Sequence, residues 1–490
     1  MSQHTLVKFV PSAANPWDRA KAAHLLNRAG FGGRPDEVDR FTRMGLDAAV
    51  DELMNYDRIS ESVAPPDFAS LRATWESYIR LVQARAAQQE RFNALVIAQR
   101  ADRQKLQEIR EWWVSRMIQT HRSLQEKMVL FWHGLLVSGV PDTRFSEFLF
   151  NQNELFRRQA LGNFKEMIAA ISKDPAMLQY LDNDSNRKGR PNENFARELL
   201  ELFTMGIGNY TEQDIKEAAR AFTGWTFRGF DGFFFNAGQH DDGTKTFLGR
   251  TGNLDGGDII TVIFEQPAAL RFLPRRLFEY FAYLRPEEGL VEEMADLFRR
   301  GNFEVAPLVR TILTSSAFYS PKAMRSQVKS PAQLVIGTAR LLDLDTSPMT
   351  NLVRAMDLMG HALLFPPNVG GWPRGESWIT TATILLRYNF SSLILTGGMP
   401  GIARRPAARP QLPVGASKTL DGAKTAGEVV DRLVDTLVAG TLDEKRKSAL
   451  VKALGASTPQ ASFAPTGAEA EARLRSALHL LMSSPEYQMA

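Results

Sequence analysis

Two polar stretches of the sequence combine residue types that carry out acid–base or ion-binding chemistry. The first, DNDSNRKGRPNENFARELLELF at residues 182–203, sets a loop of Asp, Asn and basic residues against a segment with three further acids. The second, HDDGTKT at residues 240–246, holds a proton acceptor, two carboxylates and a cation beside a glycine. These stretches are therefore the first candidates for a reactive or ion-binding site.

The candidates for proton transfer are Glu198, His240 and Asp241. If residues 195–206 form an α-helix with about 100° per residue, Glu198 lies at the margin of the apolar stripe. A carboxylate there must be hydrogen-bonded, paired, metal-bound or shifted in pKa. The alternative for Glu198 is a salt bridge to a neighbouring helix, and the alternative for the second stretch is a loop whose side chains only cap turns.

Five further side chains are candidates for substrate binding. Arg197 and Lys245 could hold negative charge, although Arg197 is also spaced to form an ordinary i,i+4 ion pair. Lys329, in a lone S-x-x-K, could bind an acid or an anion. Trp372 and Trp378, within FPPNVGGWPRGESWITT, offer flat faces on which a sugar or another ring could stack. The alternative is that both tryptophans only wedge helices together.

The loop that precedes this helix has the ligand spacing of a calcium loop. Asp182, Asp184 and Asn186 occupy positions 1, 3 and 5 of a twelve-residue span that ends at Glu193. The match is incomplete because Arg187 stands at position 6, where the sharp turn requires Gly, and nearby basic residues would repel a cation. Asx turns explain the same residues without metal. A divalent cation is therefore a secondary hypothesis, and the cofactor is otherwise unknown.

The other histidines and the missing motifs limit the classes of reaction that the sequence supports. His24 and His361 lie in apolar helical contexts, AAHLLNRAG and LMGHALLF, and are expected in the core. His133 lies within MVLFWHGLLVSGV, which is too short to cross a bilayer and predicts a buried helix. The sequence has no phosphate-binding loop, dinucleotide fingerprint, G-x-S-x-G elbow or H-E-x-x-H motif. Nucleotide hydrolysis and standard serine or zinc hydrolysis are therefore unsupported.

Composition limits the class of protein that must position these residues. With 490 residues, 44% of them hydrophobic, the chain can bury a large core. A net charge of +4 is too small over this length to favour nucleic acid as a partner. The absence of cysteine excludes disulfides and thiolate metal sites. The first thirty residues lack the apolar core of a secretory signal, which predicts a cytoplasmic protein, or a periplasmic or exported one if the chain is a processed form.

Helical periodicity dominates the chain and predicts a mainly α fold: a large multi-helix domain with a small β-hairpin insertion. Residues 68–122 are charge-rich and helical, which is typical of a solvated hairpin arm or of a partner-binding arm. Residues 225–265 are aromatic and glycine-rich, which predicts the hairpin and an ordered loop. Ser330 and Pro331 mark a helix start, with Gln333 placed to complete a capping box.

The predicted organisation has five segments. They are an N-terminal helical segment at 1–60, a long helical arm at 61–125, a helical core at 126–400 with the hairpin near 225–255, a Pro-rich linker at 401–428 and a C-terminal helical piece at 429–490. No segment is apolar for long enough to predict a transmembrane helix.

Several long blocks of the sequence resemble one known family. AAHLLNRAGFG, DPAMLQYLDNDSNRKGRPNENFARELLELFTMGIGNYTEQDIKEAARAFTGW, HDDGTKTFLG and FPPNVGGWPRGESWITTATILLRYNF are similar to signature blocks of the domain-of-unknown-function 1800 family of bacterial proteins. The resemblance covers roughly residues 20–400 and the SSPEYQ end. It implies no established reaction. It does imply frequent export, and a possible protein partner in a sulfatase-like family encoded nearby.

The chain departs from this family pattern in two places. It shows no export signal, and it has Leu135 where similar proteins tend to carry a second histidine after His133. A metal site built on that histidine pair is therefore in doubt for this chain.

Two functions are consistent with these observations. The first is a hydrolase or lyase of a carbohydrate or another polar or anionic substrate, with Glu198 and His240 or Asp241 transferring protons. Arg197 and Lys245 would then hold negative charge, and Trp372 or Trp378 would stack. The second is a non-catalytic binding or assembly module that serves a neighbouring enzyme. In the first case, Glu198, His240 and Lys245 are expected to converge in one cleft.

Overall fold

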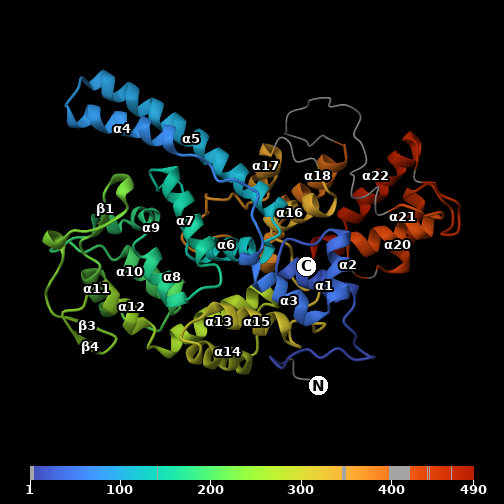
Figure 1. The fold of residues 1–490 in the computed structure, drawn as a ribbon, viewed down its shortest axis with the longest axis horizontal. Helices are drawn as coiled ribbons and strands as arrows, with labels where there is room; N and C mark the ends of the chain where they lie inside the picture. The colour runs from blue at the N-terminus through green and yellow to red at the C-terminus, as the bar shows by residue number, and fades with distance from the viewer. Residues whose placement is uncertain are drawn as a thin grey trace.

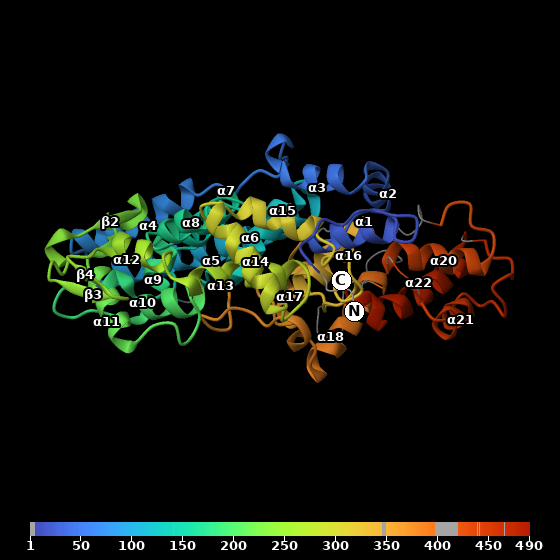
Figure 2. The same cartoon turned by 90° about the horizontal axis from the view of Figure 1, so that it is seen from below.

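The computed structural model describes residues 5–140, 142–344, 349–396, 420–438, 440, 442–464 and 466–490. Within these ranges the protein is mainly α-helical, with two small antiparallel sheets, so the predicted fold class is confirmed. The strands lie at one end of an elongated molecule and the C-terminal helices at the other (Figures 1 and 2). Apolar side chains from the N-terminal helices through to the C-terminal ones form one continuous buried core.

The chain begins with three helices that pack on the middle of the molecule. They are α1 (Arg19–Arg28), α2 (Pro35–Met44) and α3 (Leu46–Met54), followed by a 3-10 turn at Tyr56–Arg58. Asp18 caps α1 by accepting a hydrogen bond from the Lys21 amide at 2.9 Å. The apolar face of α1 is buried, so this helix is a fixed wall of the interior.

A helical hairpin forms the arm expected from the sequence. Helix α4 (Ala69–Gln83) packs along α5 (Gln88–Gln119), and Figure 1 shows the pair projecting from the body. The second half of α5, which includes Trp112 and Trp113, is buried against α7, α16 and α17. The arm is therefore anchored at its base and exposed at its tip.

Helix α6 (Ser123–Leu135) is the central element, and an ion cluster fixes it to its neighbours. The fully buried Glu126 accepts hydrogen bonds from Arg116 Nε and Arg157 Nε, both at 2.6 Å. It also accepts one from Trp113 Nε1 at 3.1 Å. Burial alone would raise the pKa of Glu126, but the two guanidinium groups outweigh it and hold that pKa below its ordinary value. The cluster joins α5, α6 and α7.

The middle of the chain supplies helices α7 to α11, most of them short. They are α7 (Ser146–Arg158), α8 (Phe164–Ile171), α9 (Pro175–Tyr180), α10 (Asn194–Glu198) and α11 (Glu212–Ala221). A 3-10 turn lies at Asn183–Ser185. The stretch predicted as one α-helix through 206 is instead α10 followed by a π-helical segment, Leu199–Thr204. The wider π turn changes the face that each later side chain occupies.

The β-hairpin predicted near 225–255 is confirmed, as two hairpins in succession. Strands β1 (Trp225–Phe227) and β2 (Phe233–Phe235) pair antiparallel, with Trp225 opposite Phe235. Strands β3 (Lys245–Phe247) and β4 (Arg250–Gly252) pair in the same way. Two 3-10 turns, at Gly229–Asp231 and Ala237–Gln239, connect these strands.

The second half of the chain returns to helices. They are α12 (Gly256–Ile263), α13 (Pro267–Phe281), α14 (Glu288–Arg300), α15 (Val305–Thr314), α16 (Pro331–Leu341), α17 (Thr350–Leu358), a 3-10 turn at Gly375–Trp378 and α18 (Thr381–Thr396). Ser330 caps α16 as predicted, because its side chain accepts from the Gln333 amide. The expected capping box is wrong, since the Gln333 side chain donates to the Asn27 carbonyl instead.

The C-terminal piece consists of α20 (Ala426–Leu437), α21 (Glu444–Ala453), α22 (Ala468–Met482) and α23 (Pro485–Gln488). It packs back on α18 through α22, and Met489 forms a bridge with Val328. Of the predicted linker at 401–428, residues 401–419 lie outside the described residues. Among the described helices, none is both long and apolar enough to span a membrane.

Candidate functional site

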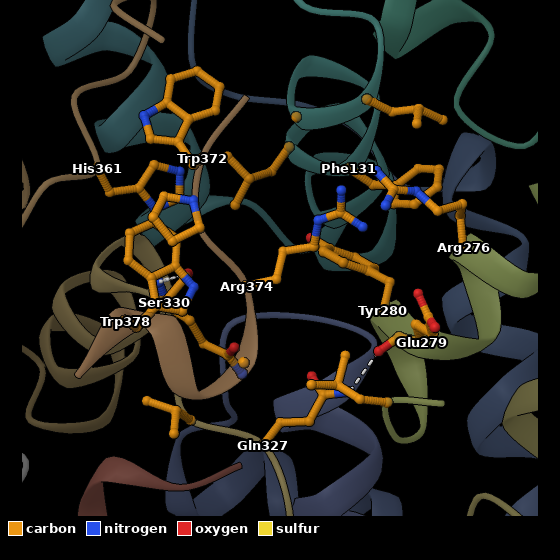
Figure 3. Close-up of a pocket in the computed structure, with 18 of the residues that line it drawn as sticks. Phe131, Arg276, Glu279, Tyr280, Gln327, Ser330, His361, Trp372, Arg374 and Trp378 are labelled. Carbon is orange, nitrogen blue, oxygen red and sulfur yellow. Dashed lines mark hydrogen bonds between the residues drawn. The ribbon is translucent and has the colours of Figure 1, made fainter. Parts of the chain in front are cut away.

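A pocket lies between α1, α6, α13 and the loop that leads from His361 to Trp378 (Figure 3). It has about 910 Å³ of empty space, including its open mouth. Figure 3 shows His361, Trp372 and Trp378 on one side, Phe131, Tyr280 and Glu279 on the other, and Arg374 between them.

Helix α6 supplies the inner wall of the pocket. Lys127, Phe131 and Gly134 all line it, and their spacing of four and three residues places them on one helical face. A Cβ at Gly134 would meet no atom within 4 Å, so this glycine leaves open space on the pocket side. The Glu126 cluster on the neighbouring position of the helix holds this face in place.

The charge of the pocket is strongly positive. Arg28, Lys127, Arg276 and Arg374 line it, against a single acid, Glu279. Arg28 is committed to the fold, because its guanidinium donates to the carbonyls of Phe281 at 2.7 Å and Ala282 at 2.5 Å.

The other three cations are not used in this way. Within the described part of the chain, Lys127, Arg276 and Arg374 make no side-chain hydrogen bond and no ion pair. Lys127 only faces the rings of Phe31 and Tyr280, at 5.3 Å from each centroid. Two guanidinium groups and one buried amine therefore face the pocket with their donors unused.

Aromatic rings form the outer wall of the pocket. The His361 ring stacks on Trp378 with centroids 5.0 Å apart and planes at 26°, and it lies 5.3 Å from Trp372. Burial, with a smaller effect of the nearby His133, lowers the pKa of His361 to about 3, so the ring is neutral. His361 Nδ1 accepts a hydrogen bond from the Ala332 amide at 3.4 Å, which leaves the proton on Nε2.

The loop that carries the two tryptophans depends on one glycine. Gly371 has φ +79°, and a Cβ there would lie 2.8 Å from the Gly134 carbonyl oxygen. Only glycine fits both restrictions. This close approach seats the following residue, Trp372, against α6, where its ring lies 4.8 Å from that of His133. The loop and the helix thus form one wall.

Glu279 is the acidic group of the pocket. It lies on α13 beside Tyr280 and is partly buried. Burial raises the pKa of its carboxyl, although the nearby backbone of Arg285 and the charge of Arg275 act in the opposite direction. A carboxyl with a raised pKa can act as a proton donor nearer to neutral pH than an exposed one.

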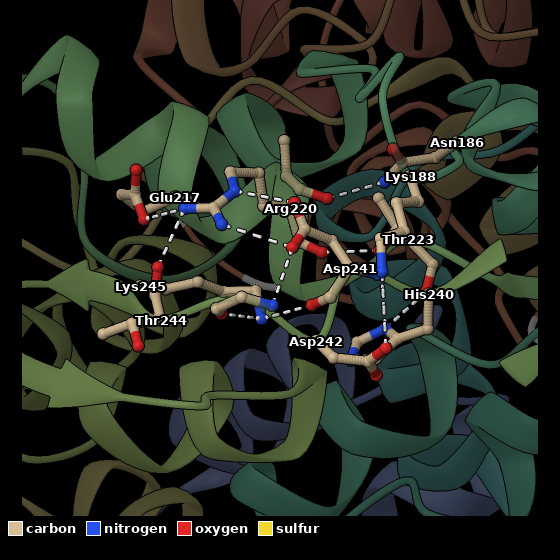
Figure 4. A network of polar contacts seen from close by, with 12 residues as sticks. Asn186, Lys188, Glu217, Arg220, Thr223, His240, Asp241, Asp242, Thr244 and Lys245 are labelled. Carbon is tan, nitrogen blue, oxygen red and sulfur yellow. Dashed lines mark hydrogen bonds and ion pairs between the residues drawn. The ribbon is translucent and has the colours of Figure 1, made fainter.

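The second polar stretch of the sequence forms a separate network in which the donors are used up (Figure 4). Arg220 donates to both carboxylate oxygens of Asp241, at 2.8 and 3.2 Å. Chiefly through these bonds, the pKa of Asp241 is lowered to about 2. The ammonium of Lys245 donates to the carbonyls of Asp241 and Gly243 at 2.6 and 3.1 Å. These hydrogen bonds hold residues 241–245 together as one closed loop.

His240 belongs to the same network. Its Nδ1 donates to the Thr223 carbonyl at 2.9 Å, and the Thr223 hydroxyl accepts from the Asp241 amide at 2.8 Å. His240 and Lys245 are both buried, at 7% and 1% exposed. The structure therefore brings His240, Asp241 and Lys245 together, with their contacts directed mainly at the loop itself.

Glu198 lies elsewhere, at the end of α10. It is half-buried and makes no hydrogen bond or ion pair with a described residue; burial and the nearby Glu201 raise its pKa. Arg197 is engaged by Glu212 at 2.8 and 2.9 Å and by Glu193 at 3.2 Å, so the predicted i,i+4 pair is present. Among the described residues, no hydrogen bond or ion pair joins Glu198 to the network of His240 and Lys245, and none of these three residues lines the pocket of Figure 3.

The four residues of the predicted calcium loop do not converge on one point. Asn186 is buried, and its amide donates to Asn183 and to the Ala219 carbonyl. Its side-chain oxygen accepts from the Asn192 amide at 2.9 Å. Glu193 pairs with Arg197. Asp182 and Asp184 are then the only two of the four predicted ligands whose side chains are not used in this way. In the described ranges no group of three or more His, Asp or Glu residues is placed to hold a metal ion.

Lys329 lies in a different, smaller pocket beside Tyr487. Its ammonium donates to the Tyr487 carbonyl at 2.8 Å and lies 4.4 Å from the centre of that ring. Burial, and then the charge of Arg387, lower the pKa of Lys329 to about 7. The contact with Tyr487 ties the start of α16 to the end of the chain.

Of the predicted binding residues, Trp372 and Trp378 line the pocket of Figure 3, whereas its cations were not found from the sequence. A usable signal existed for Lys127. It lies four residues before Phe131, so the helical period places its side chain on the buried face of an apolar helix. Arg276 and Arg374 had no such signal, since Arg276 follows a second arginine on the same helix and Arg374 lies in a polar, glycine-containing loop.

Comparison with known proteins gives one match. A family model described as "Protein of unknown function (DUF1800)" matches residues 24–489. No curated protein matches the chain, and no solved structure does so either.

Proposed function

The chain belongs to the DUF1800 family, whose description assigns no activity, and from its own geometry we propose that the pocket of Figure 3 binds a small anionic molecule. The observation that carries the proposal is the pair of guanidinium groups of Arg276 and Arg374, whose donors have no protein partner among the described residues. Holding like charges together without a counter-ion is unfavourable, and a bound anion would remove that cost.

The walls of the pocket favour an anion that also has a ring or a sugar. Trp372 and Trp378 provide flat surfaces, and His361 Nε2–H is a neutral hydrogen-bond donor beside them. Charged donors and stacking surfaces together are typical of sites for acidic or phosphorylated sugars. The substrate class proposed is therefore an anionic carbohydrate or a similar polar acid.

For an enzyme, the chemistry proposed is acid–base catalysis of a hydrolase or lyase type. Glu279 supplies the carboxyl whose raised pKa suits proton donation, and His361 supplies a neutral imidazole. Arg276 and Arg374 would stabilise negative charge on the substrate or on the transition state. These groups replace Glu198, His240 and Asp241 in the proposal, because the pocket is lined by the former set.

Calorimetric titration with three compounds tests the binding proposal. Glucose 6-phosphate and inorganic phosphate are expected to bind, and glucose to bind at least about tenfold more weakly, because it lacks the charge-assisted hydrogen bonds. Phosphate is expected to compete with the phosphorylated sugar. Equal affinity for glucose and its phosphate would contradict the proposal.

Gly134 offers a matched pair of variants for this titration. Gly134→Leu is expected to abolish binding by filling the pocket, whereas Gly134→Ala, with a methyl group in open space, is expected to keep most of the affinity. Both changes raise helix propensity, by roughly 0.5–1 kcal/mol, so neither is expected to lower the thermal unfolding temperature. Unchanged binding by a folded Gly134→Leu protein would place the anion site elsewhere.

A second candidate function, a module that docks on a protein partner, is favoured by the tip of the arm. Phe92 and Ile97 of α5 are 58% and 60% exposed, and Val96 is 44% exposed. Figure 1 shows this end of the α4–α5 hairpin away from the body. Apolar side chains grouped at an exposed tip are typical of a protein contact.

A double substitution at the tip tests the docking function. Phe92→Ser/Ile97→Ser is expected to abolish the stoichiometric recovery of a protein partner in cross-linked pull-downs from the native cell. The core does not use these side chains, so the variant is expected to stay folded and to bind phosphate as before. Arg80→Ser, on the exposed part of α4, is the control and is expected to leave recovery unchanged. Equal recovery by the double variant would rule the tip out as the contact.

A further inference from the structure

The amine of Lys127 is the most unusual group in the pocket. The residue is 4% exposed, yet it donates no side-chain hydrogen bond within the described part of the chain. A buried lysine ordinarily pairs with a carboxylate or with carbonyl groups, as Lys245 does here. Lys127 has neither, and its nearest groups are the rings of Phe31 and Tyr280 and the guanidinium of Arg28.

These surroundings favour the neutral amine. Burial, and then the positive charge of Arg28, lower the pKa of Lys127 well below its ordinary value. A lysine that is desolvated beside another cation is the usual arrangement by which proteins make an amine nucleophilic. The free base carries a lone pair, whereas an ammonium group does not.

We propose that Lys127 forms an imine with the carbonyl group of an anionic aldehyde or keto acid bound in this pocket. The inference rests on the proposed function, because the acid group of the ligand would be held by Arg276 and Arg374. The Lys127 nitrogen adds to the carbonyl carbon, and the resulting carbinolamine loses its hydroxyl group as water. One N–H proton leaves with that water, so the products are the imine and one molecule of water.

The same pocket contains a group suited to the proton transfers of this step. Loss of the carbinolamine hydroxyl requires an acid, and the Glu279 carboxyl lies on the pocket wall with Tyr280. Burial raises the pKa of Glu279, which keeps its proton available at higher pH. Lys127 and Glu279 thus have complementary roles, one as nucleophile and one as proton donor.

Reductive trapping tests the inference. The full-length protein is incubated near neutral pH with glyoxylate and sodium cyanoborohydride, digested, and mapped by mass spectrometry. We expect a secondary-amine adduct at Lys127 at least about tenfold more abundant than at Lys452, an exposed lysine of α21. Lys127→Arg keeps a long side chain with nitrogen donors but cannot form an imine, and it is expected to remove this adduct only.

Glycolate, which has the same acid group without the carbonyl, separates the two proposals. It is expected to bind by calorimetry and to protect Lys127 from glyoxylate. Glycolate binding with no excess of adduct at Lys127 would overturn the imine and leave the anion site standing. An adduct at Lys127 that glycolate does not suppress, with no glycolate binding, would support the reactive amine and contradict the anion site.

Discussion

Glu126→Gln is expected to lower the free energy of unfolding by about 3 kcal/mol, because it removes the buried carboxylate that Arg116 and Arg157 share. Each guanidinium keeps one second carboxylate, Glu61 for Arg116 and Glu154 for Arg157, so the loss stays at the lower end for a broken buried ion pair. Glu126 is 0% exposed, and Arg116 and Arg157 each donate to it at 2.6 Å. The amide is isosteric, so the loss reports charge and not volume. Urea unfolding followed by circular dichroism measures the change.

Two further variants identify the cause of the loss of stability in Glu126→Gln. Glu469→Gln removes an exposed carboxylate paired with Arg473 and is expected to change stability by at most about 1 kcal/mol. Arg116→Met/Glu126→Leu/Arg157→Met removes all three charges and is expected to recover most of the lost stability. If the triple variant were as unstable as Glu126→Gln, packing and not unpaired charge would explain the effect.

The difference in unfolding free energy between the native protein and Glu126→Gln is expected to depend on pH. The pKa of Glu126 is lowered in the folded protein, so its carboxylate contributes stability above the unfolded value of about 4.3. That contribution is lost as the pH falls through the folded value. The unfolding free energies of the native protein and of Glu126→Gln are therefore expected to approach each other in acid.

The Glu126 cluster also shows why the sequence reveals the fold more readily than the site. Apolar side chains at helical spacing predict the mainly helical fold, because burying one face of a helix is a local requirement of the chain. The partners of Glu126 come from two other helices, α5 and α7, and no local pattern links Arg116 to Arg157. Contacts of this kind are set by how helices pack, which the period does not specify.

The residues of the candidate site could not be identified from the sequence either. HDDGTKT is the densest group of reactive side chains in the sequence, yet Asp241 and Lys245 bond mainly within their own loop and to Arg220. By contrast, Lys127 precedes an apolar run and looks like an ordinary helix flank, but packing buries its amine beside Arg28. Whether a charged group is used by the fold or left for a ligand depends on its partners, and those are distant in sequence.

The loop of Trp372 and Trp378 could be predicted from the sequence in part. Pro366 and Pro367 favour a stiff approach and Gly370 and Gly371 permit close backbone contact, and Gly371 does pass close to α6. The sequence also predicts flat faces for stacking. It could not indicate that Arg374, between the tryptophans, would point across a pocket toward α13. That fact makes Arg374 the best residue for a direct test of the site.

Arg276→Gln/Arg374→Gln is expected to weaken the binding of glucose 6-phosphate or phosphate by at least about 100-fold. A hydrogen bond to a charged group contributes roughly 1.5–3 kcal/mol, so two such bonds amount to at least about 3 kcal/mol. The fold is expected to be unaffected, since neither guanidinium bonds to a described residue. Removing their mutual repulsion is expected to leave stability equal or slightly higher.

The matched control replaces two arginines outside the pocket. Arg271→Gln/Arg299→Gln removes the same net charge of two as the test variant, but Arg271 on α13 pairs with Glu288, Arg299 on α14 pairs with Asp296, and neither lines the pocket. Long-range attraction falls equally in both double variants, so only contact with the ligand distinguishes them. Calorimetry at two salt concentrations is expected to show a small, salt-sensitive loss for the control and a large loss for Arg276→Gln/Arg374→Gln. Equal losses would mean that the pocket attracts anions without binding them through these two arginines.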